Sequence, residues 1–358
     1  MTTKESRTDI LILTILMSII LSGCSDLGHA DSNSGFTSST IQFVKSYPIG
    51  MWPNALYHDN RDLYIVDSGN NEIDVYHIDT DIYENSVIKL PTDSNPVQVS
   101  ADNTYVYVIA SNSNILYQYD KATGILTSLL DHGLDMPYSL ISSDGCHIIV
   151  NSEYDYINNT AGGFITNFCD SDLQNITTTC LNPVSIQKMD KGYLVTCSGV
   201  FQYDKNYNIT GTNGSALVLF DSLFSNIKTV FNNDDPGSVA ISQEYILSGS
   251  AYQGTIHLLD HDLNILDSYH FKRPDTNVML IPRHIKDDLF VVADFNHDML
   301  SFIHTGYGKI DIHSEHRISD SQVARKGPLD LIYDDNSHQL FILNSLSETL
   351  DIYLLSDE

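Results

Sequence analysis

The feature that most constrains the fold is a segment that recurs along most of the 358-residue chain. In each copy a proline opens a short apolar run, a polar turn follows, and a second apolar run ends in serine. In four copies the serine lies fifteen positions after the proline, and in two others fourteen and seventeen positions after it. These serines are Ser68, Ser111, Ser152, Ser198, Ser250 and Ser345. A seventh copy, residues 277–294, lacks both end residues but keeps the two apolar runs.

The spacing of the copies indicates the architecture. Their ends lie 41 to 52 residues apart, and each is followed by a third apolar run, at residues 73–78, 115–119, 163–168, 216–220, 255–259, 299–304 and 349–354. A fourth run usually comes next, as at residues 86–90 and 265–271. Four short strands per repeat of 40 to 50 residues are typical of a propeller blade. We therefore expect an all-β, seven-bladed β-propeller of four-stranded antiparallel blades over residues 40–358.

The last copy differs because the sequence stops after its third run. Residues 40–47 precede the first copy just as residues 86–90 precede the second, and a proline follows each of them, at Pro48 and Pro91. We expect the 40–47 strand to complete the last blade and close the ring, which hides an edge that would otherwise pair with other chains.

The best-matching copies point to a family. The strands LYIVDS and VYVIAS, with a downstream Asn and a third strand such as IDVYHID, resemble the YVTN-type propeller repeats over roughly residues 40–358. This resemblance implies the fold, but not one function, because related propellers include lactonases, amine dehydrogenase subunits, surface-layer proteins and binding scaffolds.

The N-terminal residues predict export. Lys4 and Arg7 precede an apolar stretch at residues 10–20 that suits a signal peptide rather than a membrane span. The following Leu-Ser-Gly-Cys resembles the lipobox of bacterial lipoproteins, which implies cleavage after residue 23 and a lipid on Cys24. The alternative is an ordinary secretory signal followed by a chance cysteine.

The predicted location follows from the same segment. Residues 24–39 are small and polar, as in a flexible tether. Ser25, where some inner-membrane lipoproteins have Asp, favours the outer membrane of a Gram-negative cell envelope. With 46 acidic and 18 basic residues the net charge is −28, which argues against nucleic-acid binding because phosphate contacts need a basic face. We expect a lipid-anchored monomer.

Two long insertions are the candidate binding region. Residues 153–162 and 199–215 follow the second strands of neighbouring blades, so they share one face of the ring. Their candidate binding residues are Tyr154, Tyr156, Phe201, Tyr203 and Tyr207, with Trp52 expected on the same face. Exposed aromatic residues are favoured interface anchors. Neutral drift of surface loops, with Trp52 as a packing wedge, is the alternative.

The cysteines beyond Cys24 are candidates for disulfides. Cys146 begins a second strand and Cys169 ends the third strand of the same blade, so their ends are adjacent in an antiparallel pair. Cys180 and Cys197 form a second candidate pair at a junction between blades. Buried free thiols are the alternative, and the sequence has no Cys-x-x-Cys metal motif.

The sequence predicts no cofactor or metal, although two acidic turns allow calcium to be considered. Asp294-Phe-Asn-His-Asp298 and Asp260-His-Asp-Leu-Asn264 space oxygen ligands at alternate positions, but lack the Gly and the final acidic residue of a calcium loop. Such residues also cap turns. Catalytic motifs are absent, and Asp67, Asp294 and His297 cannot be separated from turn residues by sequence.

Two functions therefore stand after sequence analysis. The first is a binding or scaffold lipoprotein that uses the long loops to hold an envelope protein or glycan. The alternative is a periplasmic propeller enzyme, similar to lactonase-type hydrolases or amine-dehydrogenase-type oxidoreductases, with a site assembled from scattered residues of the central funnel.

Overall fold

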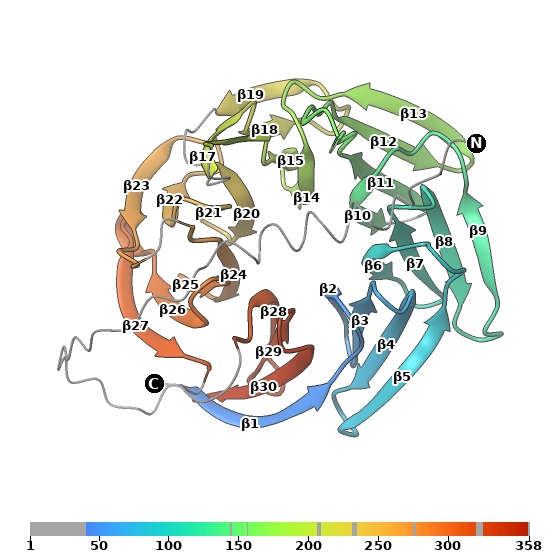
Figure 1. The fold of residues 1–358 in the computed structure, drawn as a ribbon, viewed down its shortest axis with the longest axis horizontal. Helices are drawn as coiled ribbons and strands as arrows, with labels where there is room; N and C mark the ends of the chain where they lie inside the picture. The colour runs from blue at the N-terminus through green and yellow to red at the C-terminus, as the bar shows by residue number, and fades with distance from the viewer. Residues whose placement is uncertain are drawn as a thin grey trace.

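The computed structural model describes residues 41–143, 145–155, 157–205, 209–230, 235–274, 277–319 and 325–356. Within these residues seven four-stranded antiparallel sheets are arranged as blades around a central axis (Figure 1). The chain is therefore an all-β seven-bladed β-propeller, as the repeat predicted. No helix among the described residues is long and apolar enough to cross a membrane.

Each blade contributes one strand to each of four concentric positions. The innermost strands are β2 (Pro53–Asp59), β6 (Pro96–Ala101), β10 (Pro137–Ser143), β14 (Pro183–Met189), β20 (Pro236–Ile241), β24 (Leu280–Lys286) and β28 (Pro328–Asp334). The second strands are β3 (Asp62–Asp67), β7 (Tyr105–Ala110), β11 (Cys146–Asn151), β15 (Gly192–Cys197), β21 (Ile246–Ser250), β25 (Leu289–Asp294) and β29 (Gln339–Asn344). The third strands are β4 (Glu72–His77), β8 (Ile115–Asp120), β12 (Phe164–Cys169), β18 (Ala216–Phe220), β22 (Thr255–Leu259), β26 (Met299–His304) and β30 (Thr349–Leu355). The outer strands are β5 (Ile82–Lys89), β9 (Leu126–Leu130), β13 (Asp172–Thr177), β19 (Asn226–Val230), β23 (Ile265–His270), β27 (Asp311–Arg317) and β1 (Ile41–Pro48). A turn of 3-10 helix, η1 (Gly306–Gly308), joins β26 to β27, and the hairpin of β16 (Val200–Tyr203) and β17 (Ile209–Asn213) is inserted in the fourth blade.

The hydrophobic core lies between the blades. The second and third strands carry the most apolar runs because each is covered on both faces by a neighbouring blade, as in β18, where all five residues are buried. One core cluster joins the first two blades through Val66, Ile73 and Val108, and another joins the last two through Phe302 and Leu340. Because every blade packs on two others, stability depends on closing the ring.

The N-terminal strand closes it, as predicted. β1 pairs antiparallel with β30, from Ile41 opposite Leu355 to Pro48 opposite Thr349. The Ser46 hydroxyl also donates to Asp351 Oδ1 of β30, at 2.6 Å. The last blade therefore has the order β1-β30-β29-β28. In this order β1 covers the outer edge of the third strand, β30.

The repeat proline marks a distinctive backbone position. In the six blades that open with proline, the preceding residue has a left-handed conformation, with φ between 49° and 61°. These residues are Trp52, Asn95, Met136, Asn182, Asp235 and Gly327. Asn, Asp and Gly tolerate this region most easily, which explains their prevalence here. In the sixth blade, where Leu280 replaces the proline, the preceding residue is not among those with positive φ.

The recurrent serines have structural roles. Ser68 Oγ donates to the Pro96 carbonyl at 2.5 Å, and Ser111 and Ser198 accept hydrogen bonds from the Asn95 and Asn182 side chains at 2.7 and 2.9 Å. These bonds join the end of a second strand to the start of the next blade at Ser68, and to the residue before the blade proline at Ser111 and Ser198. These three serines therefore stabilise the repeat through hydrogen bonds at the strand ends.

Candidate functional site

The propeller has two faces, which differ in the turns that they carry. Since successive strands are antiparallel, the turns between second and third strands and the connections between blades lie on one face, called here the upper face. A hydrogen bond from Gly69 N to Met51 O, 2.8 Å long, joins these two kinds of segment in the first blade. The remaining turns lie on the opposite, lower face. Ile41 is at this lower face, because it pairs with Leu355, whose N–H bonds His338 O in the β28–β29 turn.

The two long insertions lie on the upper face and contact each other. The Asn159 side chain donates from Nδ2 to the Phe201 carbonyl, 3.0 Å away, and accepts from the Tyr154 hydroxyl at 2.6 Å. The third blade thereby reaches the β16–β17 hairpin of the fourth. We call the described residues of 153–162 and 199–215 the loop surface.

The loop surface is held by its own hydrogen bonds. Asp155 Oδ1 accepts from the backbone N–H groups of Ile157 and Asn158 at 2.9 and 3.1 Å, and Asp155 also pairs with Thr160 in an isolated antiparallel bridge. At the base of the insertion Glu153 Oε2 accepts from Gly163 N at 2.8 Å. The acidic residues of this insertion therefore shape the turn, and they leave Ile157 exposed at its tip, with 79% of its surface accessible.

The aromatic residues of the loop surface differ in exposure. Tyr203 is 49% exposed, whereas Phe201 packs edge-on against Tyr252 of the fifth blade with ring centroids 6.1 Å apart. Burial, with the nearby Tyr203 phenol, raises the pKa of Tyr154 to about 12, so Tyr154 is a neutral hydrogen-bond donor at physiological pH. Tyr156 and Tyr207, the other two candidates, lie outside the described residues.

Trp52 is on the same face but in a different blade. It lies in the connection that leads from β1 to β2, with 36% of its surface exposed. Its positive φ of 52° is the conformation that the position before the blade proline adopts throughout the repeat. The structure therefore places Trp52 at a repeat position of the first blade, whereas the tyrosines belong to the third and fourth blades.

Both candidate cysteine pairs are bonded in the structure. Cys146 and Cys169 face each other in the β11–β12 ladder with Cα atoms 4.2 Å apart. Cys180, in the connection between the third and fourth blades, is bonded to Cys197 at the end of β15, with Cα atoms 6.0 Å apart. Both cysteines of the second disulfide are buried, and Cys197 is three residues before β16 in the chain.

A cluster of ionisable side chains lies on the upper face of the sixth blade. Arg273 Nε donates to Asp294 Oδ2 at 2.9 Å, and its Nη2 donates to Glu315 Oε1 at 2.6 Å. His297 Nδ1 is 3.0 Å from both carboxylate oxygens of Asp294. Sequence analysis singled out Asp294 and His297 but missed Arg273 and Glu315, because these lie 21 residues before and after Asp294, in separate segments.

The carboxylate oxygens of the two acidic turns form hydrogen bonds with other groups of the protein. Asp294 is bonded to Arg273 and His297, Asp298 Oδ1 accepts from Gly327 N at 2.8 Å, and Asp260 Oδ1 accepts from Asn264 N at 2.8 Å. Within the described part of the chain no group of three or more His, Cys, Asp or Glu side chains is arranged to hold a metal ion.

The innermost strands bring a second ion pair to the centre of the ring. Arg283 of β24 donates from Nη2 to Asp330 Oδ1 of β28 at 2.5 Å, and from Nη1 to Ser238 Oγ of β20 at 3.2 Å. Asp330 Oδ2 accepts from Leu56 N of β2 at 2.8 Å. These contacts connect four consecutive blades. No sequence motif predicted them.

Comparison with known proteins supports the fold alone. No family model matches the sequence, and no curated protein matches it. Among solved structures, a streptogramin B lyase is similar with a TM-score of 0.68 and 10% identity, covering 88% of this chain and 98% of that chain. The virginiamycin B lyase from Staphylococcus aureus is similar with a TM-score of 0.65 and 12% identity, covering 88% and 100%. The WD40 repeats of RRP9 give a TM-score of 0.65 and 9% identity, covering 89% and 98%. The chain thus shares its seven-bladed propeller with enzymes and with repeat proteins.

Proposed function

We propose that this protein is an exported, lipid-anchored propeller of the YVTN type that binds an envelope partner, a protein or a glycan, through the loop surface. The observation that carries this proposal is the contact between the two insertions, in which Asn159 joins Tyr154 to the Phe201 carbonyl. Two surface loops that vary without a function need not form hydrogen bonds with each other. A surface that such bonds hold in place is preorganised, and it loses less conformational entropy when it binds a partner. Exposed Tyr203 and Ile157 supply the aromatic and apolar groups that anchor interfaces.

The geometry of the chain ends fits this proposal. β1 begins at Ile41 on the lower face, and the loop surface lies on the upper face. A lipid on Cys24, followed by a polar tether over residues 24–39, would hold the lower face toward the membrane. The loop surface would then point outward, where it can meet a partner. The tether could span up to roughly 50 Å when extended.

The test is affinity capture from cross-linked cell envelopes with point variants rather than deletions. The double variant Ile157→Ser/Tyr203→Ser removes two exposed groups of the loop surface. The matched control is Leu223→Ser/Ile125→Ser, which removes two exposed apolar groups, 82% and 58% accessible, from turns of the lower face. We expect a specific partner with the wild type and the control, and its loss with the loop variant. The interaction is then measured with the purified partner.

The opposite result is equally informative. A partner recovered equally with the loop variant would mean that binding uses another surface. Recovery of nothing specific with the wild type would remove the support for partner binding. Unfolding curves of all three proteins should coincide, because exposed residues contribute little to stability.

A second candidate function rests on the cluster around Asp294. An imidazole and a carboxylate in contact, with an arginine and a second carboxylate adjacent, are groups that a hydrolase or lyase uses for proton transfer. The cluster is mostly buried, with 2% of the Asp294 side chain and 10% of the His297 side chain exposed, and its members bond each other. A panel of lactones, with virginiamycin B included because a similar structure is a virginiamycin B lyase, tests it: turnover that survives His297→Gln would exclude this site.

A further inference from the structure

The four cysteines after Cys24 all belong to the two blades that carry the loop surface, or to the connection between these blades. Their two disulfides lie on opposite faces of the ring. Cys146–Cys169 joins the lower ends of β11 and β12, so the full six-residue length of β11 separates it from the first insertion. Cys180–Cys197 lies on the upper face, at the end of β15, just before the second insertion. The second disulfide is therefore the one at the base of the loop surface.

A short segment, residues 180–182, leads from the third blade to the fourth and is called here the junction. Asn182 N donates to Gly162 O at 2.8 Å, at the end of the first insertion. Asn182 Nδ2 donates to Gly199 O at 3.2 Å, at the start of the second insertion. Gly199 N also donates to Leu181 O at 3.0 Å. The junction thus forms hydrogen bonds with both insertions of the loop surface.

The junction also contacts the far end of the second insertion. Leu181 N donates to Gly214 O at 3.0 Å. Gly214 has a φ of 76°, and a Cβ atom at this residue would lie 2.6 Å from Leu181 Cγ. A side chain there would displace the junction, whereas glycine allows the end of the β16–β17 hairpin to close directly on it. The position of the junction therefore sets the position of the hairpin.

The second disulfide fixes the junction to the fourth blade. Cys180 and Cys197 are buried, with 2% and 0% of their surface exposed. Cys197 pairs with Ala216 in the β15–β18 ladder, so its backbone is held in the four-stranded sheet. Without the covalent bond, separate hydrogen bonds near the surface would hold the junction, and such segments open more readily than core strands do.

We propose that oxidation of Cys180 and Cys197 completes the loop surface, so that the protein becomes competent to bind its partner after export to an oxidising compartment. This inference rests on the proposed function. In the reaction, the two thiols lose two protons and two electrons to a disulfide oxidant, an S–S bond forms between them, and the oxidant is reduced to two thiols. Thiols remain reduced in the cytosol, whereas disulfides persist in oxidising compartments. Burial then protects the bond, because thiol exchange needs access to a sulfur atom.

The test is amide hydrogen exchange, measured by mass spectrometry on the full chain. All proteins carry Cys24→Ser, which removes the one cysteine outside the two disulfides. We compare the oxidised protein with Cys180→Ala/Cys197→Ala. The amides of Leu181 and Gly199, which donate hydrogen bonds at the base of the loop surface, should exchange at least about tenfold faster in the variant.

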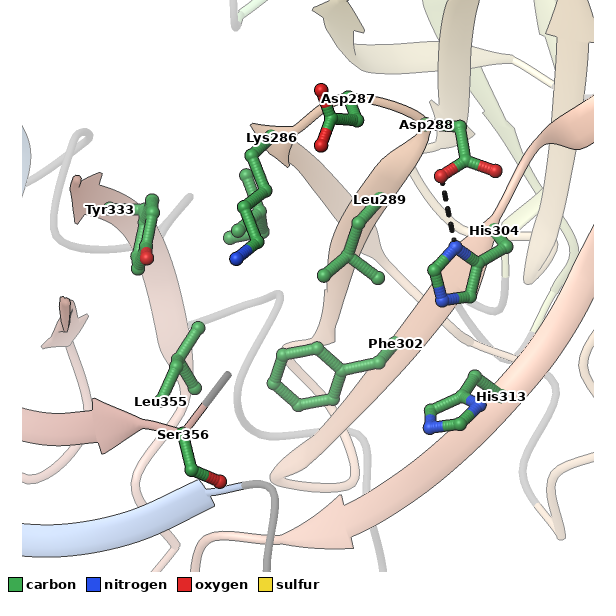
Figure 2. Close-up of a pocket in the computed structure, with 11 residues that line it drawn as sticks. Lys286, Asp287, Asp288, Leu289, Phe302, His304, His313, Tyr333, Leu355 and Ser356 are labelled. Atoms are coloured by element: carbon green, nitrogen blue, oxygen red, sulfur yellow. Dashed lines mark hydrogen bonds and ion pairs between the residues drawn. The ribbon is translucent and has the colours of Figure 1, made fainter. Parts of the chain in front are cut away.

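Two controls separate this local effect from a change in global stability. The matched control is Cys146→Ala/Cys169→Ala, because the two disulfides join residues 17 and 23 positions apart and therefore restrict the unfolded chain similarly. Exchange at the junction should stay within about twofold in this control. The internal reference is the pocket of about 190 Å³ between the sixth and seventh blades, where Figure 2 shows Phe302 and Leu289. The amides of these two residues should exchange equally in all proteins.

Reoxidation separates the role of the bond from the loss of side-chain volume in the alanine variant. The control Cys146→Ala/Cys169→Ala is refolded with dithiothreitol and then treated with oxidised glutathione, which can close the Cys180–Cys197 bond within the chain. We expect oxidation to slow exchange at the junction and to strengthen binding of the purified partner at least about tenfold, because a preorganised surface loses less entropy on binding.

Three results would overturn the proposal. The first is equal exchange at the junction before and after oxidation, and the second is equal affinity of both forms for the partner. The third is loss of the propeller in the reduced protein, as judged by circular dichroism, because the bond would then be required for the blades. If oxidation slows exchange but the oxidised wild type binds no partner, the proposed function is refuted, and the ordering of the loop surface by the disulfide is supported.

Discussion

The buried carboxyl group of Asp67 offers a quantitative test of the structure. Asp67 ends β3 on the upper face and has no exposed surface. Burial raises its pKa from 3.8 to about 6, although Asn70 donates to the carboxylate from N at 3.2 Å and from Nδ2 at 2.7 Å. The nearby carboxylates of Asp74 and Glu72 raise the pKa further. Folding therefore favours the protonated form of this group.

The magnitude follows from linkage. A pKa of about 6 in the folded state and 3.8 in the unfolded state differ by about two units, each worth about 1.4 kcal/mol. The contribution of the protonated group is complete below pH 3.8, falls as the pH rises, and is lost above pH 6. At pH 7.5 the ionised carboxylate therefore costs about 3 kcal/mol, and Asp67→Asn should recover most of it.

The assay is urea unfolding at pH 7.5 and at pH 4, monitored by circular dichroism and by fluorescence of Trp52, the single tryptophan. The control is Asp172→Asn, an exposed residue at the start of β13, which changes the net charge equally. We expect Asp67→Asn to exceed this control by about 3 kcal/mol at pH 7.5 and by much less at pH 4. An equal effect of both variants at pH 7.5, or the same excess at both pH values, would refute the reasoning.

Three further predictions test other parts of the ring. Burial lowers the pKa of His147 to about 4, so stability should fall by up to about 3 kcal/mol as the pH drops from 6.5 to 4. His147→Gln should lose this acid sensitivity in urea unfolding at pH 7 and pH 4.5, and an unchanged pH dependence would contradict it. Arg283→Met should lower the free energy of unfolding by about 3 kcal/mol, because the buried carboxylate of Asp330 then lacks its ion-pair partner. Adding Asp330→Asn should recover part of this loss, and a double-mutant cycle in urea with no coupling would argue against the central ion pair. Removing residues 1–48 should leave the edge of β30 unpaired and produce assemblies detectable by light scattering, whereas removing residues 1–40 should leave a monomer; equal behaviour of the two truncations would refute this role of β1.

The strand order of the propeller was predictable because each blade carries its own local signals. A proline that opens a strand, a polar turn and a run of β-branched or aromatic residues depend on neighbours within about twenty positions. Six innermost strands begin at the repeat proline, and β1 pairs with the last blade. The cysteine pairs followed similar reasoning, because Cys146 and Cys169 occupy opposite ends of adjacent strands. The sixth blade was also found, although it lacks the proline.

The candidate sites were only partly predictable. The face of the long insertions followed from strand alternation, and Tyr154 and Tyr203 were among the residues expected there. Their fixed arrangement was not predictable, because it depends on a bond between Asn159 and the Phe201 carbonyl, 42 residues apart. The partners of Asp294 escaped detection for the same reason, since Arg273 and Glu315 come from separate connections and strands.

By itself, the sequence determined the number of blades, the order of their strands and the closing of the ring by the N-terminal strand. These features arise from a local hydrophobic pattern that repeats along the chain, and the period of the repeat can be read directly from the sequence. Tertiary structure alone decided that Arg283 meets Asp330 at the centre and that Asn159 holds two insertions together. The physical reason is that such contacts depend on how blades pack against each other, and the side chains that meet there are distant in sequence and follow no period.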